Sequence, residues 1–265
     1  MVLNTVDNKR KELLEKIKEF RLLDDDFMSK VFEDDYDGIE FLLHIITEIP
    51  DLKVQEARTQ YSIKNLKGRS VRLDIYAVDS NGKKYNIEVQ RADRGAGTKR
   101  ARYNSSVIDA NSLLPGTDFS DLPETYVIFI TENDFMGGNK PIYHVERVVK
   151  ELGVNFDDEA HIIYVNGAYR DESPIGLLMH DFSCKNPDDM HYKILADKTR
   201  YFKEDEKGVA AMCKIMEDLI DNEKKESAIR LLANGKLSNK EIAEVLGLSV
   251  EVVNTLDEEN KAVVS

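Results

Sequence analysis

The stretch that decides the fold is VRLDIYAVDSNGKKYNIEVQ, residues 71–90. Apolar and polar residues alternate in both of its halves, and the turn-forming residues DSNG stand between them at 79–82. This pattern predicts a β-hairpin. Asp74 lies in the middle of the first predicted strand and Glu88 in the middle of the second. Because strands disfavour Asp, and Glu to a lesser degree, acids at both positions need an explanation.

The pairing of the two strands determines whether these acids meet. Side chains on one face of a strand recur every second residue, so Glu88 and Gln90 share a face. If the turn closes at residues 80–81, Asp74 lies opposite Ile87 and diagonal to Glu88. A wider turn or a bulge would instead bring both acids onto one face.

Two carboxylates held close together are costly unless a cation neutralises them. The side-chain oxygens of Asp74 and Glu88, with the main-chain carbonyl of Val89, would form a site of hard oxygen ligands suited to Mg²⁺ or Mn²⁺. Such an ion can activate water and stabilise the charge that develops on a phosphate. For the hairpin alone, an edge with solvated acids is the alternative, because such edges are common in acidic proteins.

A basic segment follows the hairpin directly. Residues 90–104, QRADRGAGTKRARYN, contain one acid and five basic residues: Arg91, Arg94, Lys99, Arg100 and Arg102. A basic loop and helix start beside a carboxylate pair is the arrangement that cleavage of a phosphodiester requires. A salt-bridged surface helix is the alternative for Arg94 and Lys99. Tyr103 could stack on DNA or hydrogen-bond to it, although packing within the helix is the more common role.

The composition narrows the class of protein. The 265 residues have a formal net charge of −13, which disfavours a protein that coats DNA or binds an anionic membrane. A nuclease with a local basic groove stays compatible with this charge. The first 26 residues are too charged for a signal peptide, and apolar runs such as FLLHII (41–46) are too short to span a bilayer. We therefore expect a cytoplasmic protein with no membrane partner.

Cysteine and histidine give no recognisable metal motif. Cys184 and Cys213 are not in CxxC spacing, so the sequence indicates neither a zinc site nor a disulfide framework. The 5 histidines are scattered, without HxH or HExxH spacing. We expect them to be core or surface residues.

Outside the hairpin, helical spacing and short apolar runs alternate along the chain. We expect helices over 8–23, in a short segment capped by Asp26 or Ser29, over 38–49 before Pro50, and over 98–114, capped by Thr98 and ended by Pro115. Strands are expected over 54–63, 125–131 and 160–166, the last two buried on both faces. This order predicts an α/β fold in which helices sandwich a mixed sheet.

The character of the sequence changes near residue 205. Strand signals end there, which predicts one domain over 1–205 and an all-helical C-terminal region over 206–265. Within that region, LSNKEIAEVLGLSVEVVNTL (237–256) resembles a helix-turn-helix, with a cap at Ser238, a turn at Gly247 and a second cap at Ser249. Its first helix is expected to bury Ile242, Ala243, Val245 and Leu246.

The second of these helices is poorly suited to reading DNA. It has no Arg or Lys before Lys261, and only Asn254 is well suited to contact a base. Its acids would face phosphates unfavourably. A packing or dimerisation module, through which the chain could form a homo-oligomer, and a DNA reader therefore stay open as alternatives.

The order of helix, strand with Asp, strand with Glu-x-x and basic helix resembles the PD-(D/E)xK nuclease superfamily. More narrowly, the chain is similar to its transposase-like branch, the Rpn-like recombination-promoting nucleases. The likeness rests on LLDDDFMSKVF (22–32), RLDIYAVDSNGKKYNIEVQ (72–90), KRARYNSSVIDANSL (99–113), LPETYVIFITENDFMGGNKPIYHVER (122–147), HIIYVNGAY (161–169), PIGLLMHDFSC (174–184) and DDMHYKILADKTRYFK (188–203). The resemblance implies a restriction-endonuclease-like core with a mixed central sheet flanked by helices. It also implies cleavage of DNA with a divalent metal and a role in recombination.

The resemblance also assigns roles to single residues. Asp74 matches the aspartate of the motif and Glu88 its second acid, while Gln90 stands where the motif has lysine. Leu73 precedes Asp74 in place of the proline, which matters little because proline is costly in a strand. The lysine orients and acidifies the attacking water, whereas glutamine can orient it but has no charge. Glu40 could match an acid that some members contribute to the metal, or be an exposed helix residue.

The predicted site therefore has three parts. Asp74, Glu88 and Gln90 are the catalytic candidates, and Asp74, Glu88, the Val89 carbonyl and Glu40 are the candidate ligands of Mg²⁺ or Mn²⁺. The candidate DNA contacts are Arg91, Lys99, Arg100, Arg102 and Tyr103, of which Lys99 or Arg100 could supply the charge that Gln90 lacks. The alternative to a metal-dependent endonuclease is an inactive nuclease fold that serves as a nucleic-acid-binding or assembly module.

Overall fold

The computed structural model describes residues 2–65, 68–91 and 93–264, and only the backbone of 2–10, 93–94 and 261–264. The chain divides into two compact units. One comprises Glu15–Asp205, and the other comprises Glu206 onward together with the beginning of helix α1 (Val2–Glu19), up to Leu14. The expected domain division at residue 205 stays a prediction.

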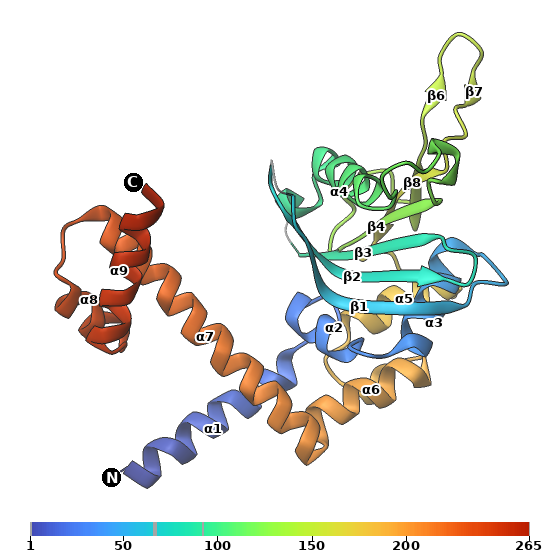
Figure 1. Cartoon of the computed structure of the whole chain (residues 1–265). Helices are drawn as coiled ribbons and strands as arrows, with labels where there is room; N and C mark the ends of the chain where they lie inside the picture. The colour runs from blue at the N-terminus through green and yellow to red at the C-terminus, as the bar shows by residue number, and fades with distance from the viewer. Residues whose placement is uncertain (1, 66–67, 92, 265) are drawn as a thin grey trace. The chain divides into compact units, whose positions relative to one another are not determined.

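A six-stranded mixed sheet forms the centre of the first unit, in the order β1-β2-β3-β4-β8-β5. The first three strands pair antiparallel, β3, β4 and β8 pair parallel, and β5 returns antiparallel to β8. The strands are β1 (Val54–Ile63), β2 (Val71–Asp79), β3 (Lys84–Gln90), β4 (Thr125–Thr131), β5 (Ile142–Val145) and β8 (Ala160–Asn166). A two-stranded ribbon, β6 (Val148–Val149) and β7 (Val154–Asn155), projects beyond the sheet (Figure 1). The expected α/β fold with a mixed sheet is confirmed.

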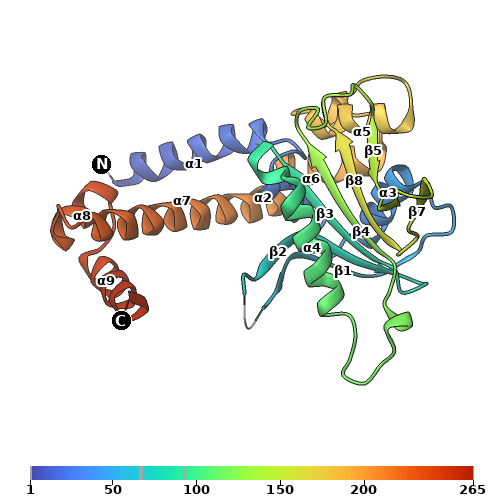
Figure 2. The same cartoon turned by 90° about the horizontal axis from the view of Figure 1, so that it is seen from above.

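Helices cover both faces of this sheet (Figures 1 and 2). Helix α4 (Thr98–Ala110) covers one face, where its Ala101, Val107 and Ile108 join Phe129 and Tyr164 of the sheet in one buried cluster. The opposite side has α2 (Asp25–Val31), α3 (Tyr36–Thr47), α5 (Pro174–Ser183) and α6 (Lys193–Glu204). Short 3₁₀ turns are η1 (Asp93–Ala96), η2 (Phe119–Asp121) and η3 (Pro187–Asp189). The face that α4 covers is the one that carries the acids of the hairpin.

The helix ends differ from those expected, for local reasons. Helix α2 has Asp24 as its N-cap residue, ahead of the expected Asp26 or Ser29. Thr98 is the first residue of α4, not its cap, which is Gly97. The same helix ends at Ala110 instead of Leu114, because the side chains of the next two residues bond back to carbonyls of its last turns. Asn111 Nδ2 donates to the Val107 oxygen at 2.7 Å, and Ser112 Oγ to that of Ile108 at 2.6 Å.

The turn of the hairpin is one residue wider than a closure at residues 80–81. The Asp79 N–H donates to the Lys83 carbonyl at 3.1 Å, which leaves three residues in the loop. Gly82 adopts a φ of +81°, a backbone conformation that glycine takes without strain. One oxygen of Asp79 accepts the N–H groups of Asn81 and Lys83, both at 2.9 Å. The aspartate therefore holds the wider turn in place.

The wider turn changes the register of the strands. Ile75 pairs with Ile87 and Tyr76 with Asn86, so the expected position of Asp74 opposite Ile87 is wrong. Extending this register by one residue pair places Asp74 directly opposite Glu88. The wider-turn alternative is the correct one, and both carboxylates lie on the same face of the sheet.

The second unit contains three C-terminal helices: α7 (Glu206–Asn234), α8 (Asn239–Leu246) and α9 (Val250–Val264). A small core of Ala228, Ile242, Ala243 and Val253 joins them. The expected cap and turn are confirmed: Ser238 forms a capping box with Glu241, and Gly247 ends α8 at a φ of +62°. The expected burial of Val245 is wrong, because this residue is 70% exposed.

Asn254, the base-reading candidate of α9, is engaged within this unit. Its Oδ1 accepts a hydrogen bond from Asn239 Nδ2 at 2.9 Å. This contact links α8 to α9, which favours a packing role for the side chain. None of the helices within the described ranges has the length and apolar character needed to cross a bilayer.

Candidate active site

Two buried carboxylates lie side by side on the central strands of the first unit. Asp74 on β2 is 5% exposed, and Glu88 on β3 is 0% exposed. Asp74 Oδ2 accepts the backbone N–H of Val89 at 3.0 Å, which fixes the Asp74 side chain against the neighbouring strand. The hairpin register thus creates an acid pair that solvent barely reaches.

Glu88 is held by an asparagine pair and an arginine. Its Oε1 accepts Asn86 Nδ2 at 2.9 Å and Asn104 Nδ2 at 3.5 Å, and its Oε2 accepts Arg100 Nη2 at 2.5 Å. Arg100 is itself anchored, because its Nη1 donates to the Gly95 carbonyl at 3.1 Å. Charge-assisted contacts of this kind are the stronger class of hydrogen bond, so Glu88 has one well-defined orientation.

Burial changes the protonation of the pair. It raises the pKa of Asp74 to about 8, and the charges of Glu88 and Asp25 add to the effect, while the Val89 N–H and Arg100 oppose it. Burial also raises the pKa of Glu88, against the lowering effects of Arg100 and Asn86. Near neutral pH the metal-free pair therefore retains a proton, and a divalent cation could take its place. Buried carboxylate oxygens with excess negative charge fit Mg²⁺ or Mn²⁺.

A third acid, Asp25, belongs to the same neighbourhood. Its Oδ1 accepts Gln60 Nε2 at 3.0 Å, and Gln60 Nε2 also donates to Ser29 Oγ at 2.6 Å. Gln60 interrupts the pairing of β1 with β2 at the level of Asp74, with a φ of +51°. Among the described residues, its buried Oε1 has no hydrogen-bond partner. A strained residue with an unused acceptor beside two acids is typical of a functional site that a cation completes.

These residues border a groove of about 1230 Å³. Its lining includes Asp25, Asp74, Gln90, Tyr103 and five basic residues: Arg69, Arg72, Lys99, Arg100 and Arg102. Within the parts of the chain that the structure describes, no salt bridge involves Arg69, Lys99 or Arg102. A concentration of available cations in a protein with 50 acids and 37 basic residues is suited to binding phosphates.

Residues 38–168 match the family model described as PD-(D/E)XK nuclease family transposase. This part of the chain belongs to the PD-(D/E)XK nuclease transposase family. No curated protein and no solved structure gives a match. Membership of the PD-(D/E)XK family supports a nuclease-like function. Nucleases of this family generally use divalent metal ions, and DNA is the substrate class that the family implies.

The structure brings most of the PD-(D/E)XK candidates to one place. Asp74, Gln90, Lys99, Arg100 and Arg102 all line the groove, and Glu88 is bonded to one of them. Gln90, at the position of the family's lysine, lies tightly against Gly95. A Cβ atom added at Gly95 would be 1.7 Å from Gln90 Oε1, so glycine is required there for this glutamine conformation.

Two of the DNA-contact candidates, Tyr103 and Arg91, bond to other parts of the protein. The Tyr103 hydroxyl donates to the Arg69 carbonyl at 2.5 Å, although its ring borders the groove. Arg91 is not part of the groove lining, and its guanidinium bonds Asp24 at 2.8 Å and Glu132 at 3.4 Å. These two acids neutralise Arg91, which leaves the DNA-contact role of this residue a prediction.

Glu40 is not brought to the acid pair. Its carboxylate bonds Lys53 Nζ at 2.6 Å and accepts the Val54 N–H at 3.0 Å. Val54 pairs with Asp79 at the turn end of the hairpin, five residues from Asp74. At the rise of a strand, this separation corresponds to about 16 Å. Asp25, which sequence reasoning missed, stands nearer the position that Glu40 was expected to take.

The further residues around the acid pair left some signal in the sequence. Asp25 lies within LLDDDFMSKVF, one of the segments that carry the family likeness, but three successive aspartates gave no reason to choose it. Asn86 shares a strand face with Glu88 by its spacing of two residues. Asn104 lies one helical turn after Arg100, which puts both on the same face of α4.

Proposed function

We propose that this protein is an Mg²⁺- or Mn²⁺-dependent DNA endonuclease that hydrolyses phosphodiester bonds. The observation that supports it best is the buried pair of Asp74 and Glu88 beside a groove that also carries Lys99 and Arg102, which form no salt bridge with the described residues. A structural role does not account for placing these charges together, because each acid raises the free energy of the other's ionised form. A contribution to recombination is the corresponding biological expectation.

The residues divide the work of such a reaction. Asp74 and Glu88 would hold the ion, with Asp25 as the nearest further acid. When bound, the ion activates water and stabilises negative charge on the phosphate. Gln90 lines the groove and would orient the attacking water by a hydrogen bond, without altering its charge.

The basic residues would act on the substrate in different ways. Lys99 and Arg102 are exposed on α4 and would neutralise phosphates of the DNA backbone. Arg100 donates one hydrogen bond to Glu88 and another to the Gly95 carbonyl, so its first role is to position Glu88. Its side chain is 40% exposed and borders the groove, which leaves its remaining donors accessible to a phosphate.

A nucleic-acid-binding protein without cleavage is the second candidate. Two observations favour it: Gln90 brings no charge to the position of the motif lysine, and the Arg100 guanidinium already compensates Glu88. Both candidates require the groove to bind DNA. They differ only in whether a bound divalent ion leads to hydrolysis.

Cleavage of supercoiled plasmid distinguishes these candidates. The full chain is incubated with Mg²⁺, Mn²⁺, Ca²⁺ or EDTA, and binding to the same DNA is measured in parallel. We expect nicking with Mg²⁺ or Mn²⁺. EDTA should stop this nicking, and added Mg²⁺ should restore it. Binding without nicking under every ion would support the second candidate and overturn the first.

Two further expectations accompany this proposal. We place the protein in the cytoplasm, and we expect any homo-oligomer to form through the C-terminal helices. Val245 on α8 and Val250 at the start of α9 are apolar and exposed, at 70% and 38%. Sedimentation of the full chain and of a Val245→Asp variant would test the oligomer, because a charge at this surface should weaken such an interface.

A further inference from the structure

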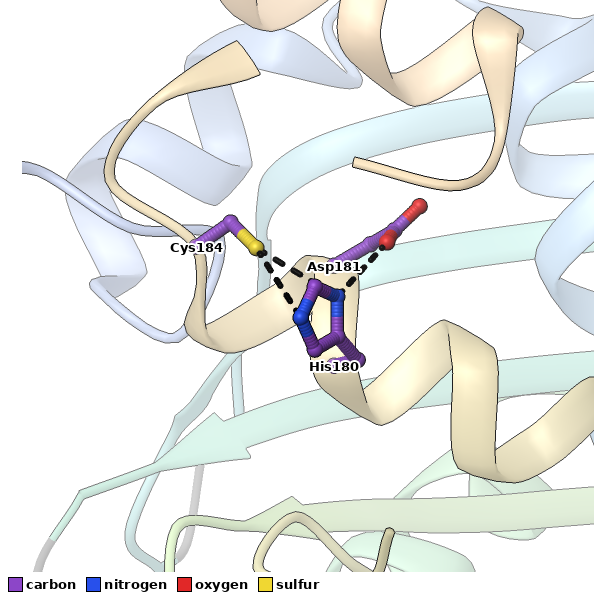
Figure 3. A group of neighbouring side chains, drawn as sticks. All are labelled: His180, Asp181 and Cys184. Atoms are coloured by element: carbon purple, nitrogen blue, oxygen red, sulfur yellow. Dashed lines mark hydrogen bonds and ion pairs between the residues drawn. The ribbon is translucent and has the colours of Figure 1, made fainter. Parts of the chain in front are cut away.

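A second group of metal-binding side chains lies at the end of α5. His180 and Asp181 come from the last turn of this helix, and Cys184 is its C-cap residue (Figure 3). One ligand atom from each residue lies within 4.8 Å of the other two. Neither the nuclease-like site nor the family match, which ends at residue 168, involves these residues.

The two distances from His180 Nδ1 to the other ligand atoms agree with tetrahedral coordination. His180 Nδ1 is 3.3 Å from Asp181 Oδ1 and 3.5 Å from Cys184 Sγ. With zinc bonds of about 2.0 Å to nitrogen and oxygen and about 2.3 Å to sulfur, a tetrahedral angle separates N from O by about 3.3 Å and N from S by about 3.6 Å. Both distances from His180 Nδ1 therefore already match those between two zinc ligands, and all three ligand atoms lie within 4.8 Å of one another.

The surrounding backbone holds this geometry in place. Asp181 is fully buried, and its two oxygens accept the backbone N–H groups of His191 and Tyr192, both at 2.8 Å. Each carboxylate oxygen still has a lone pair for another contact. The Asp189 carbonyl oxygen lies 3.8 Å from Cys184 Sγ, on the same connection between α5 and α6. A main-chain oxygen or a water molecule could thus complete the coordination.

A catalytic cysteine is the main alternative for this group. Reactive cysteines have a lowered thiol pKa, as a result of nearby cations or a helix N-terminus. Here the nearest charged side chain among the group is the carboxylate of Asp181. The thiol also follows the C-terminal end of a helix. These surroundings disfavour a nucleophile.

We propose that His180, Asp181 and Cys184 bind a zinc ion. The donor set of imidazole nitrogen, carboxylate oxygen and thiolate sulfur suits the borderline-soft Zn²⁺ and not the hard Mg²⁺ of the groove. One carboxylate and one thiolate would also balance the two positive charges of the ion. The zinc would hold the last turn of α5 to its C-cap residue, and it would do so independently of the nuclease-like activity.

Cobalt substitution tests this site on the full chain. After removal of metals with a chelator, Co²⁺ is titrated into a variant that combines Asp74→Asn with Glu88→Gln, so that the groove does not compete. We expect one equivalent of Co²⁺ to give thiolate-to-cobalt charge-transfer absorption, and Zn²⁺ to displace it. Cys184→Ser should remove the absorption and weaken Zn²⁺ binding at least tenfold. Cys213→Ser, which changes the other cysteine, should leave both unchanged.

A measurement without a variant covers the case in which Cys184→Ser does not fold. X-ray absorption of the zinc-loaded wild-type chain should detect one sulfur at about 2.3 Å beside nitrogen and oxygen ligands. Zinc with no sulfur neighbour would overturn the proposal. So would the absence of charge-transfer absorption, or absorption that survives in a folded Cys184→Ser variant.

Discussion

Replacing Asp74 by asparagine should make the metal-free protein more stable at alkaline pH while it removes the proposed ion site. An aspartate in an unfolded chain ionises near pH 3.9. In the folded protein the pKa of Asp74 is raised to about 8, so ionisation is disfavoured by folding. Protonated Asp74 therefore contributes its full share to the free energy of unfolding below the unfolded pKa. This contribution is lost as the pH rises through the folded pKa. Asparagine resembles the protonated acid and should show no such loss.

The size of the effect follows from the same pKa. Between pH 5 and a folded pKa of about 8, the free energy of unfolding changes by about 1.4 kcal/mol for each pH unit, which gives a ceiling of about 4 kcal/mol. Asp74 borders the groove, so its surroundings are more polar than a closed core, which reduces the electrostatic cost. We therefore expect the wild type to lose about 2 kcal/mol more than Asp74→Asn between pH 5 and pH 9.

Urea unfolding in EDTA, followed by near-ultraviolet circular dichroism, measures this difference. The chain has 11 tyrosines, 10 phenylalanines and no tryptophan. Every one of these aromatic residues lies between Phe20 and Phe202, so the signal reports the first unit alone. Asp121→Asn is the matched control, because it removes an exposed acid from the same unit. If wild type and Asp74→Asn lose stability in parallel from pH 5 to pH 9, the assigned burial and coupling of Asp74 are wrong.

Three further predictions concern the residues around the acids. Arg100→Ala should lower the free energy of unfolding by about 2 kcal/mol, because it leaves the buried Glu88 charge without its partner, and Glu88→Gln should recover most of the loss in urea unfolding at pH 8. Replacing Lys99 and Arg102 together by alanine should reduce the slope of log affinity against log salt by up to about two on duplex DNA, measured by fluorescence anisotropy. Gln90→Lys should retain or raise the nicking rate, because a positive charge would lower the pKa of the attacking water.

Matched variants separate these effects from general changes in charge. Lys236 and Lys240 are exposed on the second unit, and replacing both by alanine should leave the salt slope unchanged if the groove binds the phosphates. An equal loss of slope in both double variants would contradict the assignment. A double-mutant cycle with no coupling between Arg100 and Glu88 would remove the positioning role of the arginine. Complete loss of nicking in a folded, metal-binding Gln90→Lys variant would show a role for Gln90 that charge cannot replace.

The sequence contained most of the information for the central sheet but not for its register. Alternating residues and DSNG predict the hairpin, and two short apolar runs predict β4 and β8, because burial on both faces leaves no polar positions. The register depended on whether the loop held two residues or three, and DSNG is compatible with both. Gly82 at φ +81° and the bonds to Asp79 decide this, and such bonds are visible only in the folded chain.

The candidate site, like the sheet, could be predicted from the sequence only in part. Asp74 and Glu88 could be found because acids are unusual within strands. Asp25 could not be chosen from three successive aspartates, because only the folded chain shows that Gln60 donates a hydrogen bond to it. His180 and Cys184 escaped notice for a different reason: a spacing of four residues at the end of a helix matches no common metal motif, and the Asp181 contacts that hold the loop come from residues further along the chain.

The central claim is that the buried acid pair cleaves the DNA that the groove binds. Its most direct test measures binding and nicking of one plasmid by the same preparation of Asp74→Asn in Mg²⁺, with Asp121→Asn as the control. The account predicts that Asp74→Asn still binds DNA, because the groove cations are unchanged, and that it nicks at least about 100-fold more slowly. Nicking at the wild-type rate by folded Asp74→Asn would contradict it.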